Sequence, residues 1–234
     1  MRLSGKIGYI VGAICGTTLL LGTVVWAQAS ASRSTPEGAL QELKKALEAA
    51  EWKVVAEMLA HPKEPKPLVP PGLIDAWLRA QSASVQLELA LREWAEKSGA
   101  SNPQAASQHP FSPYLNVPSD YTLQILDVEP PGQSARVRAR VKCSHRGRGE
   151  EETVSVVRLG NNWYVTPPTL LRQLFQGAED AALAERRTQG LNKLADLLAE
   201  TAQLLRSGQL KDRAAVLEHL LRRFHQEQIA DLLR

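Results

Sequence analysis

Cys143 and His145 are a thiol and an imidazole close enough in the sequence to act together. They stand two positions apart in a segment that alternates apolar and charged residues, so on a strand both side chains would point to the same face. Such a pair could act as a thiolate with its imidazole base, or supply two ligands to a metal ion. No cluster of Cys, His and acidic residues completes either site. We therefore expect a buried cysteine beside a turn histidine.

The other titratable residues indicate no stronger site. His219 and His225 are six positions apart in a helical segment, which places them on different faces and argues against joint ligation. Asp75 and His109 are the best candidates for a general base, although we expect surface or capping roles for them. The sequence thus predicts no catalytic, cofactor-binding or metal-binding residues, and a protein that is not an enzyme.

A row of basic residues is the most unusual surface pattern of the chain. The residues alternate with apolar ones, so a strand here has one apolar and one basic face. The row consists of Arg136, Arg138, Arg140 and Lys142. In one interpretation the row is a solvated face that Glu150, Glu151 and Glu152 compensate. In the other, it contacts anionic lipid headgroups or an acidic partner.

These candidates lie downstream of an export signature. Residues 7–27 form an uncharged, largely apolar run that follows Arg2 and Lys6, which predicts a cytoplasmic N-terminus and an extracytoplasmic body. The run is long enough to remain as a single transmembrane anchor, since a spanning helix needs about 20 residues. Alternatively, residues 1–31 are a signal peptide that is cut after Ala29 or Ala31, and the mature protein is secreted or periplasmic.

The charge balance of the exported body excludes a general nucleic-acid binder. The 28 basic residues include Arg2 and Lys6, which leaves 26 against 25 acidic residues beyond the apolar run. A nucleic-acid binder would need a concentrated basic surface. Cys143 is the only cysteine outside the run, so no disulfide can form within the exported body.

Three helices are predicted before the strands. Ser34, Thr35 and Pro36 are typical of a helix start, and a short helix should follow from Trp52 until His61-Pro62. The proline-rich residues 62–72 favour an extended connector. A long helix is expected over residues 73–97. Its predicted buried residues are Ile74, Trp77, Leu78, Val85, Leu89 and Trp94.

The spacing of apolar residues changes twice in the second half of the chain. Residues 100–120 carry four prolines and no periodicity, which favours a mobile loop in which Phe111 and Tyr114 pack down. An antiparallel meander of strands is expected from Tyr121 to Pro167-Pro168. After it, two amphipathic segments separated by Gly208 predict an antiparallel helical hairpin. The apolar stripe of that hairpin must be covered by the main domain or by another chain.

Two passages resemble exported bacterial members of the nuclear-transport-factor-two-like superfamily, also called the cystatin-like cone. Residues 34–62, STPEGALQELKKALEAAEWKVVAEMLAHP, are similar to the opening of such proteins. Residues 154–168, VSVVRLGNNWYVTPP, are similar to their closing hairpin. The resemblance covers about residues 34–168 and implies a curved antiparallel sheet around helices, with a pocket at the open end. It implies no chemistry, because a fold does not carry a function with it.

The predicted architecture is α+β, with N-terminal helices packed on a curved antiparallel sheet. Three parts are expected: the signal or anchor of residues 1–31, a cone-like domain of residues 34–168, and a C-terminal helical hairpin of residues 169–234. The leading hypothesis is a non-enzymatic, exported or membrane-tethered binding and assembly module of unknown ligand. Self-association or a protein partner would use residues 178–234. The alternatives are a small-molecule isomerase, dehydratase or hydrolase of the same fold, and a structural envelope component that pairs through its hairpin.

Overall fold

The computed structural model of the chain describes residues 33–115 and 119–233. The predicted signal or anchor segment of residues 7–27 lies outside these ranges. Within them, no helix combines the length and the apolar composition needed to cross a membrane.

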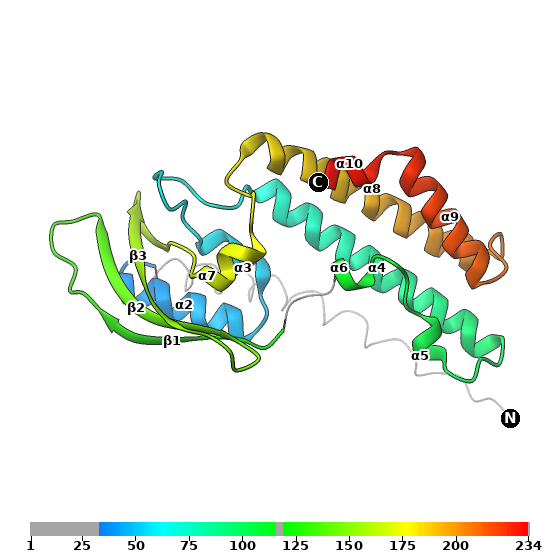
Figure 1. The fold of residues 1–234 in the computed structure, drawn as a ribbon, viewed down its shortest axis with the longest axis horizontal. Coiled ribbons are helices and arrows are strands. Elements are labelled where there is room, and N and C mark those ends of the chain that lie inside the picture. The colour runs from blue at the N-terminus through cyan, green and yellow to red at the C-terminus, as the bar shows by residue number, and fades with distance from the viewer. Residues whose placement is uncertain (1–32, 116–118, 234) are drawn as a thin grey trace, which may run out of the picture.

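Helices pack against a curled four-stranded antiparallel sheet, so the predicted α+β class is confirmed (Figure 1). The strands are β1 (Tyr121–Val128), β2 (Arg136–His145), β3 (Glu151–Leu159) and β4 (Asn162–Val165), and their spatial order is their order in the sequence. This is the predicted meander. Arg146 and Gly147 adopt positive φ angles in the β2–β3 turn, and Gly160 does so in the β3–β4 turn. The left-handed conformation is one that glycine adopts at little cost.

Three helices accompany the sheet and form with it the sheet lobe. They are α2 (Pro36–Glu48), α3 (Trp52–Met58) and α7 (Thr169–Leu174). Thr35 caps α2 as its sequence suggests, since its Oγ accepts a hydrogen bond from the Gly38 N–H at 3.0 Å. Leu40 and Leu43 of α2 and Val137 and Val141 of β2 are buried in the same core. The inner face of the sheet is therefore filled by side chains.

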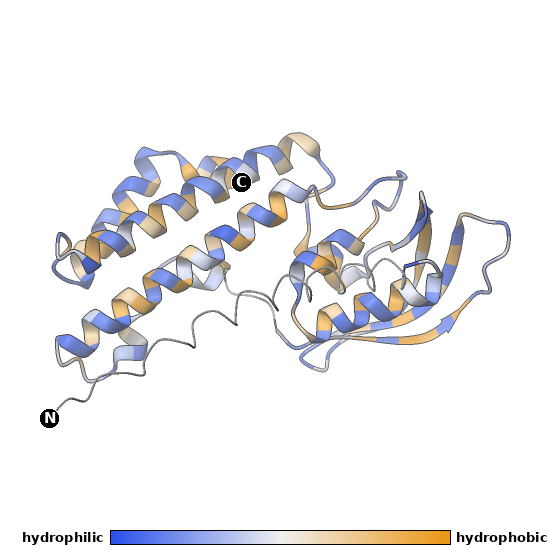
Figure 2. Cartoon of the chain, turned by 180° about the vertical axis from the view of Figure 1, so that it is seen from behind, coloured by the Kyte–Doolittle hydropathy of each residue, from blue (hydrophilic) through white to orange (hydrophobic). Residues whose placement is uncertain are grey.

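The remaining helices form a second, helical lobe. They are α4 (Pro71–Lys97), α5 (Pro103–Ala106), α6 (Ser112–Leu115), α8 (Ala181–Arg206), α9 (Arg213–Gln226) and α10 (Ile229–Leu233). Helices α4 and α8 lie side by side and run in the same direction, away from the sheet lobe, whereas α9 returns antiparallel to α8 (Figure 1). Figure 2 shows hydrophobic patches recurring along these helices and alternation along the strands.

The apolar side of the C-terminal helices is covered by α4 of the same chain. Leu194, Leu197 and Leu198 of α8 share a core with Ala80 and Leu87 of α4. Small residues on α4 let the two helix backbones approach closely. Helix α4, which lies in the predicted cone-like range 34–168, thus joins the sheet lobe to the helical lobe.

The predicted buried side of the long helix is wrong at two positions. Val85 is 50% exposed and Leu89 is 45% exposed, whereas Ala80, Ala83 and Ala90 are buried. The helix carries two apolar stripes, and α8 packs on the one with the smaller side chains because these allow close contact.

The segment expected to be a mobile loop contains the short helices α5 and α6. The expectation that Phe111 packs down is confirmed, because its ring is buried and lies 4.7 Å, between centroids, from that of Phe224. Residues 116–118 and the side chain of Tyr114 lie outside the description.

Candidate ligand-binding site

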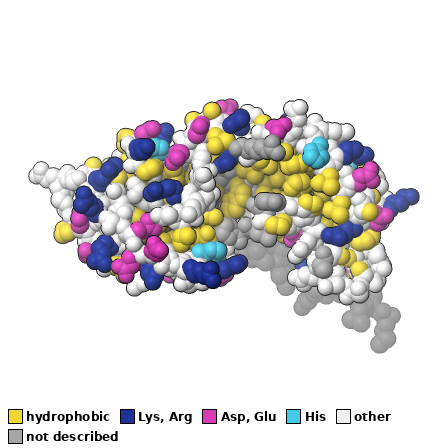
Figure 3. Space-filling model, viewed as in Figure 1, with side chains coloured by type: hydrophobic (Ala, Val, Ile, Leu, Met, Phe, Trp, Pro, Cys, Tyr) yellow, Lys and Arg dark blue, Asp and Glu magenta, His cyan; other side chains and the backbone are white. Residues whose placement is uncertain are grey.

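A cavity of about 310 Å³ lies between the two lobes. It is found where the first turns of α4 and α8 approach α3, α7 and α10 (Figure 1). Its lining is Trp52, Val69, Leu73, Ile74, Trp77, Leu174, Phe175, Gln176, Ala178, Arg187, Leu191 and Leu233. Figure 3 shows hydrophobic side chains gathered over the middle of one face of the molecule. The volume is at the lower end of the range of about 300–1,000 Å³ that is usual for small-molecule pockets.

Two tryptophans form aromatic walls of the cavity. Trp52, at the start of α3, is buried, and its ring contacts Tyr121 edge-on at a centroid distance of 5.5 Å. Its ring also lies 6.5 Å from that of Phe175. Trp77 is half-buried and packs against the cores of both lobes. These contacts fix the aromatic walls before any ligand arrives.

The segment between α7 and α8 supplies the third wall. Glu152 of β3 holds this segment to the sheet, because both of its carboxylate oxygens accept the Thr169 N–H, each at 3.0 Å. Leu174 and Phe175 follow at the end of α7. Leu174 is 40% exposed and Gln176 is exposed as well, so the segment lies at the rim of the cavity.

Helix α10 closes the cavity from the C-terminal side through Leu233. It approaches α8 closely at Gly190, where a Cβ atom would lie 2.9 Å from Leu232 Cβ and 2.9 Å from Leu233 Cδ2. Only a glycine leaves this space. The position of Leu233 therefore depends on the missing side chain at residue 190.

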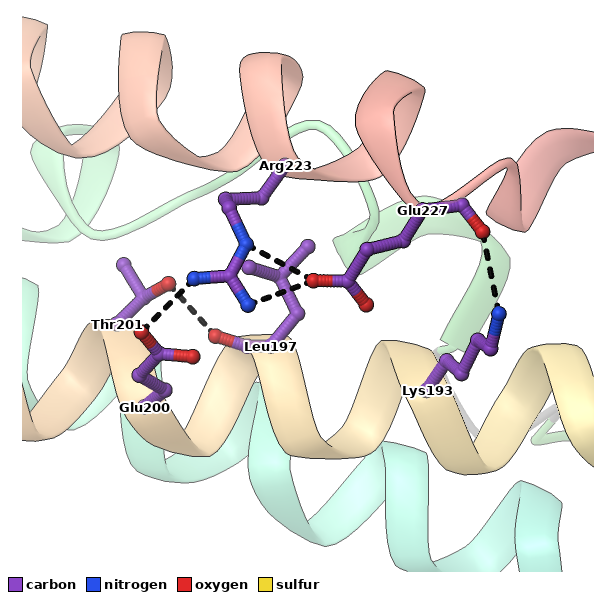
Figure 4. Close-up of polar contacts among 6 residues, drawn as sticks. All are labelled: Lys193, Leu197, Glu200, Thr201, Arg223 and Glu227. Carbon is purple, nitrogen blue, oxygen red and sulfur yellow. Dashed lines mark hydrogen bonds and ion pairs between the residues drawn. The ribbon is translucent and has the colours of Figure 1, made fainter.

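Polar contacts anchor the preceding helix, α9, on α8 (Figure 4). The Arg223 guanidinium donates to Glu227 Oε1 from Nε at 2.8 Å and Nη2 at 2.6 Å, and to Glu200 Oε1 from Nη1 at 3.0 Å. Lys193 Nζ donates to the Glu227 carbonyl oxygen at 3.3 Å. The contacts to Glu227 hold the turn that leads into α10.

Arg187 is the charged member of the lining. Its Nη1 donates to the Gln176 carbonyl oxygen at 2.5 Å, which holds the side chain at the rim. The guanidinium packs over Gly177, where a Cβ would lie 3.0 Å from Nη1 and where φ is +81°. Among the described residues, no carboxylate forms an ion pair with Arg187.

The lining can bind apolar groups but offers no group for proton transfer. It contains no Asp, Glu, His, Cys, Lys or Tyr, and a guanidinium stays protonated in proteins. A general acid or base must be able to change its protonation state near the working pH. Binding through apolar contact and one fixed positive charge is what this arrangement can do.

The basic row lies elsewhere, on the outer face of the sheet. Arg136, Arg138 and Arg140 are exposed, whereas the intervening Val137 and Ala139 are buried. Arg140 forms an ion pair with Glu151 at 3.1 Å, and both side chains are more than half exposed. Partial compensation by the glutamates is thus present at one of the four positions. The contact with an anionic partner stays a prediction.

Cys143 and His145 lie in different environments on β2. Cys143 is buried, and this burial, with a smaller contribution from Glu152, raises the pKa of its thiol to about 11. His145, at the end of β2, stacks on the ring of Tyr121 at a centroid distance of 4.4 Å. The thiol is thus protonated at neutral pH, which argues against a thiolate nucleophile.

Asp75 and His109 are not brought together either. Asp75 of α4 forms an exposed ion pair with Lys53 of α3 at 2.8 Å. His109 is buried and forms a hydrogen bond with Ser84 of α4. Ser84 lies nine residues after Asp75 on this helix, which is about 14 Å along the helix axis. Neither residue lines the cavity.

His219 and His225 differ in environment. His219 is buried, its Nε2 has no hydrogen-bond partner among the described residues, and burial lowers its pKa. His225 is exposed. No group of three or more His, Cys, Asp and Glu residues in the described ranges is arranged to hold a metal ion.

The sequence interpretation missed Arg187 and the cavity itself. Arg187 is one of two adjacent arginines in an amphipathic helix, which indicates only a solvated face. The sequence places Trp52 and Trp77 in separate helices, with Trp77 on the predicted buried side of its helix, and nothing in their spacing shows that they border one cavity.

No family model matches this chain, and no curated protein or solved structure is significantly similar to it.

Proposed function

We propose that the chain is a non-enzymatic binding module, exported or tethered by residues 7–27, whose inter-lobe cavity takes a small apolar molecule. The observation that carries this proposal is the lining, in which aromatic and aliphatic side chains surround a volume of about 310 Å³. The kinship with the cone-like superfamily stays a prediction and is not needed for it.

The proposal is favoured over a small-molecule enzyme of the same fold. An isomerase, dehydratase or hydrolase would need at least two polar titratable groups near the substrate, and Arg187 is the only titratable residue of the lining. It is also favoured over an envelope component that pairs through its hairpin. Much of the apolar side of α8 packs on α4, which leaves less apolar surface for a second protein.

Binding of the uncharged dye Nile red tests the proposal. The measurement uses the mature chain. If the mature chain retains the apolar run, it is reconstituted in nanodiscs, and the dye signal of empty nanodiscs is subtracted. We expect saturable binding to the wild-type protein. Leu191→Trp, which places an indole inside the cavity, should weaken it at least tenfold, which is about 1.4 kcal/mol.

Leu221→Trp is the matched control, because Leu221 is 45% exposed on α9 and is not part of the lining. It should leave the dye affinity unchanged. Thermal unfolding first establishes that both proteins are folded. Equal affinities of the wild-type protein and Leu191→Trp for Nile red would then exclude the cavity as the binding site.

A further inference from the structure

We infer that the occupant of the cavity is an amphiphile with a carboxylate headgroup, an aliphatic chain whose acid group binds Arg187. This inference rests on the proposed function and adds the chemical class of the ligand. Three properties of the site support it. The lining changes from apolar to polar toward the rim, Arg187 has N–H groups that form no hydrogen bond within the described residues, and the Arg187 side chain is held in place.

The cavity has an apolar end and a polar rim. Trp52, Val69, Ile74 and Ala178 are each at least 96% buried, so this part of the lining is shielded from solvent. The rim carries the exposed Gln176 and the half-exposed Arg187, together with Leu174. A ligand with an apolar tail and a polar head would match this gradient, with its tail toward Trp52.

Arg187 has donors left for the headgroup. One hydrogen bond, from Nη1 to the Gln176 carbonyl oxygen, is formed within the described part of the chain. The guanidinium has five N–H donors, and its planar fork matches the two oxygens of a carboxylate. All ion pairs of the described residues involve other basic residues, so no carboxylate in this part of the chain neutralises the charge of Arg187.

The side chain is also held in place before binding. The carbonyl oxygen of Gln176 fixes Nη1, and the absence of a side chain at Gly177 leaves room for the guanidinium next to the backbone. An arginine that is already positioned loses less conformational entropy when it binds an anion. A solvated surface arginine would have no such support.

Competition between octanoate and octanol against Nile red tests the inference, because the two probes have the same chain length and differ in headgroup charge. We expect octanoate to bind the wild-type protein at least tenfold more tightly than octanol. Arg187→Gln should abolish this preference by weakening octanoate alone. Octanol affinity then reports that the cavity of the variant is intact.

Arg187→Lys is the second variant, because it keeps the positive charge but loses the planar guanidinium that can donate two parallel hydrogen bonds to a carboxylate. It should retain part of the preference for octanoate, and it decides the question if Arg187→Gln does not fold. Equal affinity of octanoate and octanol for the wild-type protein would overturn the inference and leave the proposed function standing. A preference that persists in Arg187→Gln would overturn it as well, since the carboxylate would then bind elsewhere. Failure of both probes and of Nile red would instead refute the proposed function.

Discussion

His109 and Ser84 form a buried polar pair in the helical lobe. His109 Nδ1 accepts the Phe111 N–H at 3.3 Å, which leaves Nε2 to carry the ring hydrogen and donate to Ser84 Oγ at 2.9 Å. Both ring nitrogens are thus satisfied by the neutral imidazole. Burial lowers the pKa of His109 from its ordinary value of 6.5, against the smaller opposing effects of Glu88 and Ser84.

This lowered pKa predicts how the stability of the protein depends on pH. Between the folded-state and unfolded-state pKa values, the folded protein holds fewer protons than the unfolded chain. The stabilisation is therefore complete above about pH 6.5 and is lost as the pH falls through the folded-state pKa. His219, whose pKa burial also lowers, should act in the same direction.

Urea unfolding from about pH 7.5 to about pH 5 measures this effect. We expect the free energy of unfolding to fall with pH in the wild-type protein and to fall less steeply in His109→Gln. At neutral pH the variant should lose about 1–3 kcal/mol, because Ser84 and the Phe111 N–H lose a well-placed partner. His225→Gln, at an exposed position of α9, is the matched control for the exchange of a histidine for glutamine. An equally steep slope in His109→Gln would contradict the assignment.

Among the helices and strands, the packing of α10 and the charge of the outer face of β2 each lead to a testable prediction. Helix α10 is short and reaches the cavity only because Gly190 admits Leu232 and Leu233. Alanine at a helical glycine ordinarily stabilises a helix by about 1 kcal/mol. Here the added methyl would overlap with α10, and such overpacking costs about 1–3 kcal/mol.

Gly190→Ala should therefore displace α10 and weaken Nile red binding. Amide hydrogen exchange of residues 229–233 should become faster while that of the central turns of α8 stays slow. Gly72→Ala is the matched control, since its Cβ would meet only Thr188 Cγ2 at an ordinary 3.8 Å. Unchanged exchange in α10 of Gly190→Ala would show that the close contact does not hold the helix.

The basic face of β2 predicts a salt-sensitive association with anionic vesicles. The ion pair between Arg140 and Glu151 is exposed and contributes little, so the row keeps most of its charge for a partner. Arg138→Gln combined with Arg140→Gln should reduce co-sedimentation of the protein with vesicles that contain anionic phospholipid. Arg92→Gln with Lys97→Gln removes the same charge from the exposed surface of α4 and should have a smaller effect. Equal losses in both double variants would mean that net charge acts, rather than the row.

At the scale of the whole molecule, what could be predicted from the sequence was local. The cap at Thr35, the alternation of β2 and the turns of the meander depend on neighbouring residues, and each is found where the pattern places it. The buried stripe of α4 was mistaken because it is chosen by α8, a helix that begins more than eighty residues later. In the sequence, the larger apolar side chains of Val85 and Leu89 are better candidates for burial than the alanines of α4.

The cavity could not be predicted for the same reason. Its walls come from α3, the connector before α4, α4 itself, the segment around α7, α8 and α10. Their meeting depends on α4 and α8 leaving the sheet lobe in parallel, which a pattern within one segment does not encode. The separation of Asp75 from His109 also follows from α4, which extends away from the sheet.

If an apolar molecule occupies the cavity, it lies against Trp52 and Trp77. Quenching of tryptophan fluorescence by bromooctanol, an uncharged alcohol with a heavy atom on its chain, tests this without involving Arg187. We predict saturable quenching in the wild-type protein and its loss when Trp52→Phe and Trp77→Phe are combined, although Trp94 and Trp163 remain, as does Trp26 where the apolar run is not cleaved. Quenching of the same amplitude and midpoint in that variant would place the ligand elsewhere and contradict the account.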